Sequence, residues 1–301
     1  MPPVLTVALY HHIADEPGPS IDRLAVTTSP RRFEQQLDWL ERRYDVVDLD
    51  TVLAGGPLPR RPLLLTFDDG YRSVLDVAAA TLRRRGLPSV FFVSAAFLGD
   101  TLPLDNVLCG LTHTHDPAEL GEAIGPGPPC ATLRDLIARV ALQPYERRRI
   151  LPAEIRERFG VADGDGTGVL LEPEELAGLA GLGMAVGNHS RSHIHCRALL
   201  ESDHLERELV SYRPELERLT GAPVRAFAYP YGQAPDTTPV VEAALAGSGH
   251  EATFQVGARS NRWRRGGPWS RVSFQDQAPA EMLRHLRLEP LARSVRDRLL
   301  R

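Results

Sequence analysis

The stretch LLLTFDDGYRSVL at residues 63–75 decides the fold, because it combines a strand, a tight turn and the start of a helix. Its leucines predict a buried strand, and Asp68 and Asp69 stand where that strand ends. Gly70 then allows the chain to turn sharply into the next helix. Two adjacent carboxylates repel each other, so this strand end requires cations, or groups that bind one, from elsewhere in the chain.

The composition is that of an ordinary globular protein. Of the 301 residues, 43% are hydrophobic and 25% are charged, and the net charge is −4. Basic runs with interleaved aromatic residues are missing from the sequence, so nucleic acid is not an expected partner. No segment offers the roughly 18 uninterrupted apolar residues of a membrane helix. The N-terminal sequence MPPVLTVALYHH lacks the basic region of a signal peptide, which predicts a cytoplasmic protein. The sequence carries no signal for an oligomeric state.

Strand-like and helix-like segments alternate along most of the chain. Residues 30–43 predict a helix with Phe33, Leu37 and Leu40 on one face and Ser29 as its N-cap. The strands between the helices are apolar throughout, as parallel strands covered on both faces are. This pattern indicates an α/β fold with parallel strands and crossover helices, and we interpret residues 1–301 as a single barrel domain.

Residues from about 100 to 170 break this rhythm. The Gly- and Pro-rich stretches GEAIGPGPPCATL and GVADGDGTG surround one clear helix, TLRDLIARVAL. Loops between barrel strands can grow without disturbing the core, so we expect an insertion between two strands here.

The histidines of VGNHSRSHIH, residues 186–195, are the second group of residues that could take part in catalysis or bind a metal. On a helical turn His189 and His193 would share one face, at a spacing used by histidine pairs that bind zinc. Two ordinary surface histidines are the alternative interpretation. His195 could replace either neighbour as a ligand, and Cys196 is a further candidate.

A third group, FAYPYGQ at residues 227–233, also follows a predicted strand. In a β/α barrel the carboxyl ends of the strands meet at one face, where the loops build the site. Because successive strand side chains point to opposite sides, Asp68 and Asp69 can serve different tasks. One carboxylate would join His189 and His193 around a divalent metal, and the other would remain free beside it as a general base.

These motifs together resemble those of the polysaccharide deacetylase family, which shares the chitooligosaccharide deacetylase homology domain. TFDDGY is similar to the first family motif, HSRSH to the second and AYPYG to a variant of the third, while LYHHI and WSRVSF resemble the exopolysaccharide and poly-N-acetylglucosamine deacetylases. The resemblance covers roughly residues 1–100 and 170–290. It implies a distorted (β/α) barrel of about seven parallel strands. It also implies metal-dependent removal of acetyl from an N-acetylated sugar, with release of acetate. Zinc is the expected metal, with cobalt, nickel and manganese as alternatives.

The resemblance also implies a role for individual residues. It gives Asp69, His189 and His193 as metal ligands and Asp68 as the general base. The backbone N–H of Tyr231 would help to hold the oxyanion. The expected contacts with substrate come from Tyr229, Pro230, Tyr231 and Trp269.

The sequence departs from the family pattern in two places. Ala228 occupies a position where the family often has an arginine that orients the catalytic aspartate. We predict that Arg271 substitutes for it, with Arg225 as the second choice. The late family motif that carries a catalytic histidine is not clear, although LRHL offers His285. His285 is thus one candidate for the group that donates a proton. His11 or His12, at the end of the first strand, could instead reach the site, or both could be purely structural, and of these two we take His11 as the catalytic candidate.

Two other functions fit parts of this pattern. A catalytically inactive carbohydrate-binding homologue would explain the missing arginine, although a binding protein has no use for paired carboxylates. A C–N hydrolase of the same barrel type could act on a non-sugar amide or imide, and loss of metal ligands would favour it.

Overall fold

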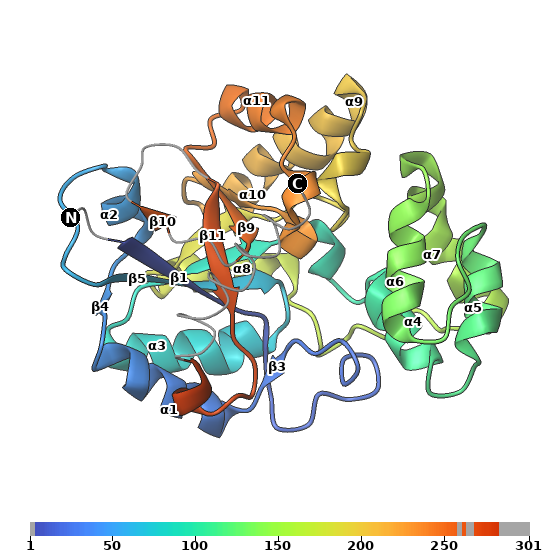
Figure 1. The fold of residues 1–301 in the computed structure, drawn as a ribbon, viewed down its shortest axis with the longest axis horizontal. Helices are drawn as coiled ribbons and strands as arrows, with labels where there is room; N and C mark the ends of the chain where they lie inside the picture. The colour runs from blue at the N-terminus through green and yellow to red at the C-terminus, as the bar shows by residue number, and fades with distance from the viewer. Residues whose placement is uncertain (1–3, 258–260, 263–267, 283–301) are drawn as a thin grey trace, which may run out of the picture.

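The computed structural model describes residues 4–257, 261–262 and 268–282. Seven parallel strands close into a barrel in the order β1-β11-β9-β8-β7-β6-β5, and β5 pairs back with β1. The predicted (β/α) barrel of about seven parallel strands is therefore confirmed (Figure 1). The barrel strands are β1 Val4–Tyr10, β5 Pro62–Asp69, β6 Val90–Val93, β7 Ala185–Asn188, β8 Ala226–Ala228, β9 Ala252–Val256 and β11 Trp269–Ser273.

Short strands extend the barrel at its margins. β4 Asp45–Val46 runs parallel to the first residues of β5, and β10 Asn261–Arg262 runs antiparallel to the start of β1. A separate pair, β2 His12–Ile13 and β3 Thr27–Thr28, follows β1.

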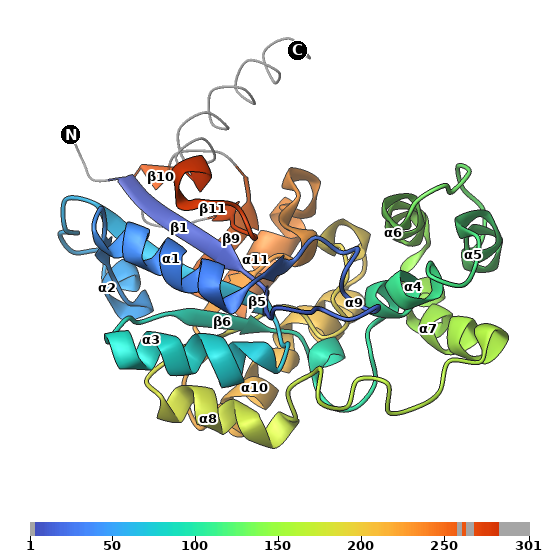
Figure 2. The same ribbon diagram turned by 90° about the horizontal axis from the view of Figure 1, so that it is seen from below.

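Helices cover the outside of the barrel, as Figure 2 shows for α1, α3, α8 and α10. In α1 the Ser29 side chain accepts a hydrogen bond from the Arg32 N–H, and Phe33, Leu37 and Leu40 are buried, as the sequence predicts. The covering helices are α1 Pro30–Glu41, α2 Leu49–Leu53, α3 Ala80–Arg85, α8 Leu176–Gly181, α9 Ser202–Leu205, α10 Tyr212–Thr220 and α11 Pro239–Gly247.

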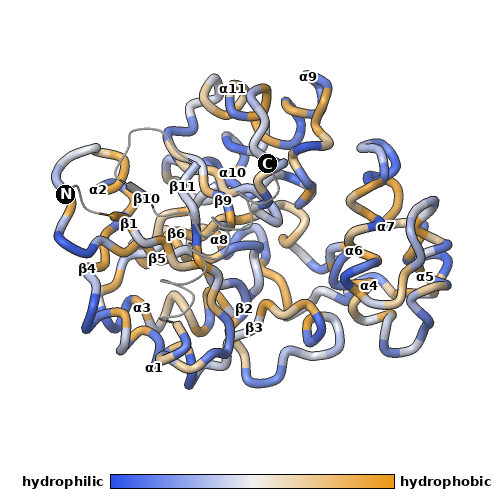
Figure 3. The backbone as a smooth tube through the Cα atoms, in the orientation of Figure 1, coloured by the Kyte–Doolittle hydropathy of each residue, from blue (hydrophilic) through white to orange (hydrophobic). Residues whose placement is uncertain are grey.

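Alternation along the strands divides the core in two. Leu63, Leu65 and Phe67 of β5 pack with the residues of the outer helices, whereas Leu64 packs with residues of other strands inside the barrel, among them Phe92. Figure 3 shows the hydrophobic colours gathered along β5 and β6 at the centre of the molecule. By this alternation Asp68, like Leu64, belongs to the inner set of β5.

Between β6 and α8 the chain forms four further helices: α4 Leu104–Leu111, α5 Pro117–Ile124, α6 Leu133–Leu142 and α7 Tyr145–Phe159. They form a lobe to one side of the barrel (Figures 1 and 2), and its hydrophobic core continues into Ile21, Tyr71 and Phe97 outside the insertion. The chain leaves and returns at a narrow base, where the Gly99 N–H donates to the Leu171 carbonyl at 2.8 Å. The sequence predicts only α6 clearly, so the other three helices are a finding of the structure. We call residues 100–170 the insertion.

Helices long and apolar enough to span a bilayer do not occur among the described residues. The three cysteines are free and buried.

Candidate functional site

The two aspartates lie at the carboxyl end of β5, at the barrel mouth. Simple alternation would send their side chains to opposite faces, but Asp69 has a φ of 80°. This left-handed conformation turns Asp69 back toward the site that Asp68 faces, so the expectation from alternation is wrong for Asp69. Gly70 follows with a φ of 149°, and a Cβ there would lie 2.9 Å from the Phe97 carbonyl oxygen. Only glycine permits this turn.

His189 and His193 follow β7 in a loop, not on a helical turn as the spacing suggests. Ser190 and His193 have φ values of 61° and 47°, which fold the loop so that both rings face the aspartates. Among the described residues, five other than glycine have a positive φ, and four of them are Asp69, Ser190, His193 and Tyr231. Each such conformation costs on the order of 1–3 kcal/mol, and strain of this kind typically gathers at functional sites.

The four side chains meet in one buried cluster. His189 Nε2 lies 3.6 Å from an oxygen of each aspartate, and His193 Nε2 lies 3.3 Å from Asp69 Oδ1. One ligand atom from each of Asp69, His189 and His193 lies within 4.8 Å of the others. Two imidazole nitrogens and one carboxylate oxygen are a donor set that suits a catalytic zinc site or a similar divalent ion.

The surroundings of His189 prepare it for such a role. Its Nδ1 lies 2.8 Å from the Ala228 carbonyl oxygen, which can only accept, so Nδ1 carries the proton and Nε2 presents a lone pair to the cluster. Burial lowers the pKa of His189 to about 4, which keeps the ring neutral. Burial raises the pKa of Asp69, but the hydrogen bond and charge of His193 and the charges of His11 and His189 outweigh it. The pKa of Asp69 therefore lies well below its usual range. Burial lowers the pKa of His193, but its hydrogen bond to Asp69 and the negative charges around it outweigh burial and raise that pKa. A neutral His189 beside an ionised Asp69 carboxylate fits a divalent metal.

Arg271 binds the other aspartate. Its two terminal nitrogens lie 2.5 and 2.6 Å from the two carboxylate oxygens of Asp68, and the Arg271 side chain is fully buried inside the barrel. The guanidinium also stands 5.3 Å from the centre of the Phe92 ring. Arg271 thus contacts Asp68, the carboxylate that an arginine at the position of Ala228 would otherwise orient. Arg225 is instead bound to Asp50 and Glu251 away from the site, so the second choice is wrong.

The two histidines after β1 differ in their surroundings. The Nδ1 atom of His11 is buried without a hydrogen-bond partner in the described part of the chain, and His11 is close enough to lower the pKa of Asp69. His12 instead contacts the Thr27 hydroxyl at 3.1 Å and the edge of Tyr71, and burial lowers its pKa to about 4. Of the two, His11 is the one whose charge acts on Asp69 and whose Nδ1 is unpartnered. His285 lies outside the described residues.

The third motif places only one of its aromatic side chains at the site. The Tyr231 ring lies 4.8 Å from the His193 ring, and its φ is 59°. Pro230 precedes it in the same turn and is buried. Tyr229 is fully buried and its hydroxyl donates to Glu242, within a core beside α11. Trp269 packs among residues inside the barrel at the first position of β11. The structure therefore does not bring the side chains of Tyr229 and Trp269 to the predicted substrate site.

His195 and Cys196, the alternative ligands, stand outside the metal-ligand group. His195 Nδ1 contacts Asp236 at 3.0 Å, and its ring stacks on Tyr231 with the centres 4.0 Å apart. The Cys196 thiol is fully buried, and burial raises its pKa well above the usual value.

Sequence reasoning missed Asp105. This residue belongs to α4 in the insertion, and its carboxylate accepts a hydrogen bond from the Tyr231 hydroxyl at 2.8 Å. Burial raises the pKa of Asp105, because it lies in the wall between the insertion and the barrel mouth. No sequence motif surrounds it, so only the packing of α4 against the mouth reveals it.

These features define a hydrolase-like barrel with a buried carboxylate–histidine cluster at its mouth. The sequence model of the polysaccharide deacetylase family matches residues 55–248, which is more than half of the chain, so the chain belongs to that family. The resemblance to this family that the sequence motifs indicate is confirmed. The prediction that the protein is a carbohydrate deacetylase is confirmed with it. No curated protein matches the chain in sequence.

Solved structures of similar fold cover nearly the whole chain. The deacetylase PplD of Streptococcus pyogenes, solved with acetate, has a TM-score of 0.60 at 14% identity, covering 95% of this chain and 99% of that one. IcaB from Ammonifex degensii has a TM-score of 0.58 at 20% identity, covering 96% and 97%. A de-N-acetylase from Aggregatibacter actinomycetemcomitans has a TM-score of 0.59 at 16% identity, covering 94% and 100%. At these identities the similarity establishes the fold.

Proposed function

We propose that this protein is a metal-dependent hydrolase that removes the acetyl group from an N-acetylated sugar and releases acetate. The observation that carries the proposal is the convergence of Asp69, His189 and His193 beside a second carboxylate, Asp68, that is held by a buried arginine. A divalent ion held by Asp69, His189 and His193 would polarise the amide carbonyl and acidify water at this site. Zinc is our first choice, and cobalt, nickel or manganese also suit these ligands.

The chain itself supplies the positioned proton acceptor. Asp68 takes a proton from the attacking water, and its contact with Arg271 fixes both carboxylate oxygens in one orientation. A positioned base of this kind contributes about 10²–10⁴-fold to the rate. Attack forms a C–O bond to the amide carbon. The C–N bond then breaks, so that acetate and the free amine of the sugar leave.

Two further groups complete the reaction. The backbone N–H of Tyr231 donates to the oxygen that becomes negative during attack, in a loop held by the left-handed conformation of this residue. His11 donates a proton to the leaving nitrogen. Its unpartnered ring nitrogen near Asp69 supports that role over His12, whose ring is engaged by Thr27.

The geometry weighs against an inactive carbohydrate-binding homologue. That alternative rests on the absence of an arginine at Ala228, and Arg271 provides a guanidinium at the same carboxylate. The complete group of metal-ligand side chains likewise favours deacetylation over the non-sugar C–N hydrolase.

The test is acetate release by purified protein from a panel of N-acetylated mono- and oligosaccharide glycosides. We expect release with zinc or cobalt, loss of release after chelation, and recovery when metal is restored. The Asp68→Asn variant is the control, because it should retain the metal and lose activity. A metal-loaded wild type that releases no acetate from any member of the panel would refute the proposal.

A further inference from the structure

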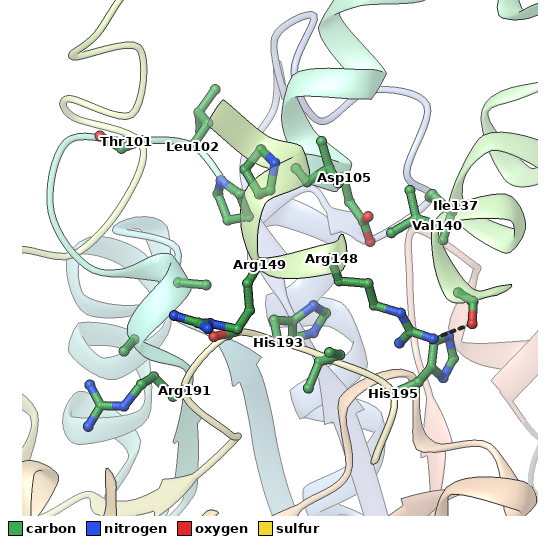
Figure 4. Close-up of a pocket in the computed structure, with 18 of the residues that line it drawn as sticks. Thr101, Leu102, Asp105, Ile137, Val140, Arg148, Arg149, Arg191, His193 and His195 are labelled. Carbon is green, nitrogen blue, oxygen red and sulfur yellow. Dashed lines mark hydrogen bonds between the residues drawn. The ribbon is translucent and has the colours of Figure 1, made fainter. Parts of the chain in front are cut away.

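A cavity of about 590 Å³ lies between the barrel mouth and the insertion. Figure 4 shows His193 and His195 on the barrel side of this cavity and Asp105, Ile137 and Val140 on the side of the insertion. Because His193 and Tyr231 line it, the cavity borders the proposed metal site. Its volume is within the range of pockets that enclose a small molecule.

The wall that the insertion contributes is mainly aliphatic. Helices α4, α6 and α7 and the segment before α4 supply it, and none of its described residues is aromatic. Sugar hydroxyls placed against these aliphatic side chains would lose hydrogen bonds with water and gain none from them, whereas an apolar group gains about 25 cal/mol per Å² of surface buried. The aliphatic members are Leu102, Pro103, Leu104, Ile137, Val140, Ala141, Pro152 and Ala153.

The arginines around the cavity are largely engaged by other groups. Arg149 pairs with Glu146, Arg156 with Asp165 and Arg191 with Glu215. Arg148 has no carboxylate hydrogen-bonded to it among the described residues, but its guanidinium donates to the carbonyls of Ala141 and Gln143 at the end of α6. The Arg149, Arg156 and Arg148 contacts lie within the insertion, and Arg191 is held by Glu215 on the barrel side, so the aliphatic surface is the larger free feature of the wall.

We propose that this cavity binds an apolar aglycone, an alkyl or aryl group joined to the N-acetylated sugar, and that the insertion selects for it. This inference rests on the proposed function, since the sugar itself must reach the cluster around His193. The substrate is then a small amphiphilic glycoside, and not a polysaccharide that runs through an open groove.

The experiment compares kcat/KM for the methyl and hexyl glycosides of N-acetylglucosamine, with N-acetylchitotetraose and N-acetylglucosamine 1-phosphate as competing substrates. We expect the hexyl glycoside to be preferred over the methyl glycoside by about tenfold or more, which corresponds to roughly 1.4 kcal/mol. Binding of the same four compounds to the Asp68→Asn variant is measured by calorimetry, so that affinity is known independently of turnover.

Two variants on α7 distinguish the effect of a charge in the cavity wall from the effect of a charge elsewhere on the helix. Ala153 is exposed and lines the cavity, so Ala153→Asp adds a charge to the wall without disturbing a packed core, and the preference for hexyl over methyl should fall toward one. Ile150 lies on the same helix, is 52% exposed and does not line the cavity. Ile150→Asp should keep the preference unchanged.

The outcomes distinguish the two proposals. Failure of all four compounds to react would contradict the proposed function, and preferential binding of the hexyl glycoside by Asp68→Asn would still support the aglycone site. Turnover without a hexyl preference overturns the inference alone, as does a preference for the tetraose. A preference for the phosphate that Arg148→Leu removes would also overturn it, because the cavity would then be an anion site.

Discussion

Arg271 on β11 and Asp68 on β5 form a two-bond ion pair inside the barrel, although 203 positions separate them in the sequence. Strand β1 stands between their strands and pairs with both, so closure of the barrel is what brings the two residues together. The pair is almost completely excluded from water, with 0% and 3% of the two side chains exposed. A contact of this kind ties the orientation of the proposed base to the integrity of the fold.

Removal of the arginine should therefore affect both stability and activity. We expect Arg271→Ala to lower the free energy of unfolding by about 3–5 kcal/mol, because it leaves a buried carboxylate without its partner. Arg271→Lys should recover only part of the loss in kcat, since an ammonium cannot grip both oxygens of Asp68. Urea unfolding and steady-state kinetics measure the two effects. A stable Arg271→Ala variant with activity within about twofold of wild type would contradict this role.

Asp68 itself should be separable from metal binding. We predict that Asp68→Asn retains the metal and the fold but lowers kcat by about 10²–10⁴-fold, the contribution of a positioned base. Elemental analysis of the purified variant gives the metal content, and acetate release gives the rate. Loss of metal from this variant would mean that Asp68 and Asp69 have exchanged roles.

The metal ligands predict a different pattern. His189→Ala, His193→Ala and Asp69→Ala should each lower the bound metal and remove the rise in melting temperature that zinc gives the wild type, because ligand binding to the folded state stabilises it. His195→Ala is the matched control, since His195 lies two residues from His193 but contacts Asp236 instead. Full metal occupancy in His189→Ala and His193→Ala alike would reject the site.

His250 should make stability sensitive to acid. The Asn188 amide group lies 3.2 Å from His250 Nε2 and can only donate there, so the ring must be neutral, and burial lowers the pKa of His250 to about 4. The folded state thus binds fewer protons than the unfolded state, whose histidine titrates near 6.5. The contribution of neutral His250 to the free energy of unfolding is therefore fully present above about pH 6.5, and it is lost as the pH falls toward 4.

We expect this histidine to account for about 1–2 kcal/mol of the loss in the free energy of unfolding between pH 7.5 and pH 5. Denaturant titrations at the two pH values measure it. His250→Gln keeps an acceptor for Asn188 without a titrating ring, so the variant should lose less stability over this interval. An equal loss in the wild type and the variant would show that other groups cause the acid sensitivity.

Asp105 should act through Tyr231. Its carboxylate holds the Tyr231 hydroxyl at 2.8 Å and thereby fixes a residue in a left-handed conformation that side chains disfavour. We predict that Asp105→Ala and Tyr231→Phe each lower kcat/KM by roughly tenfold, and that the double variant is no worse than either one. Asp105→Asn should restore much of the activity, because its amide oxygen can also accept. Additive losses in the double variant would show that the two residues act independently.

The sequence was sufficient for the barrel and for the grouping of Asp69, His189 and His193. Apolar strands such as β5 alternate with helices such as α1, which begins at a capping serine, and these local signals agree with the tertiary fold. Arg271 could be matched to Asp68 because a family pattern names the missing cation. The same reasoning failed for Tyr229, whose side chain turns into the core beside α11, and for Trp269, which stands at the first position of β11, away from the barrel mouth.

Local backbone conformation was the other limit. Asp69 and His193 occupy left-handed conformations that no propensity predicts, because the surrounding fold imposes them. Helix α7 of the insertion was missed for a different reason. The apolar residues of α7 do not gather on one face, and Pro152 stands inside the helix, so its sequence lacks the usual helical pattern.

The narrow base of the insertion has a consequence for how this enzyme could diversify. Leu98 and Leu171 are partners in a β-bridge, so the chain enters and leaves the lobe at two adjacent positions. A different lobe grafted at these two positions would meet the same barrel closure, the same strained loops and the same ion pair. Mutation can therefore replace most of the lobe while the metal-ligand residues and the ion pair are inherited, as long as the new lobe keeps an acceptor for the Tyr231 hydroxyl in place of Asp105.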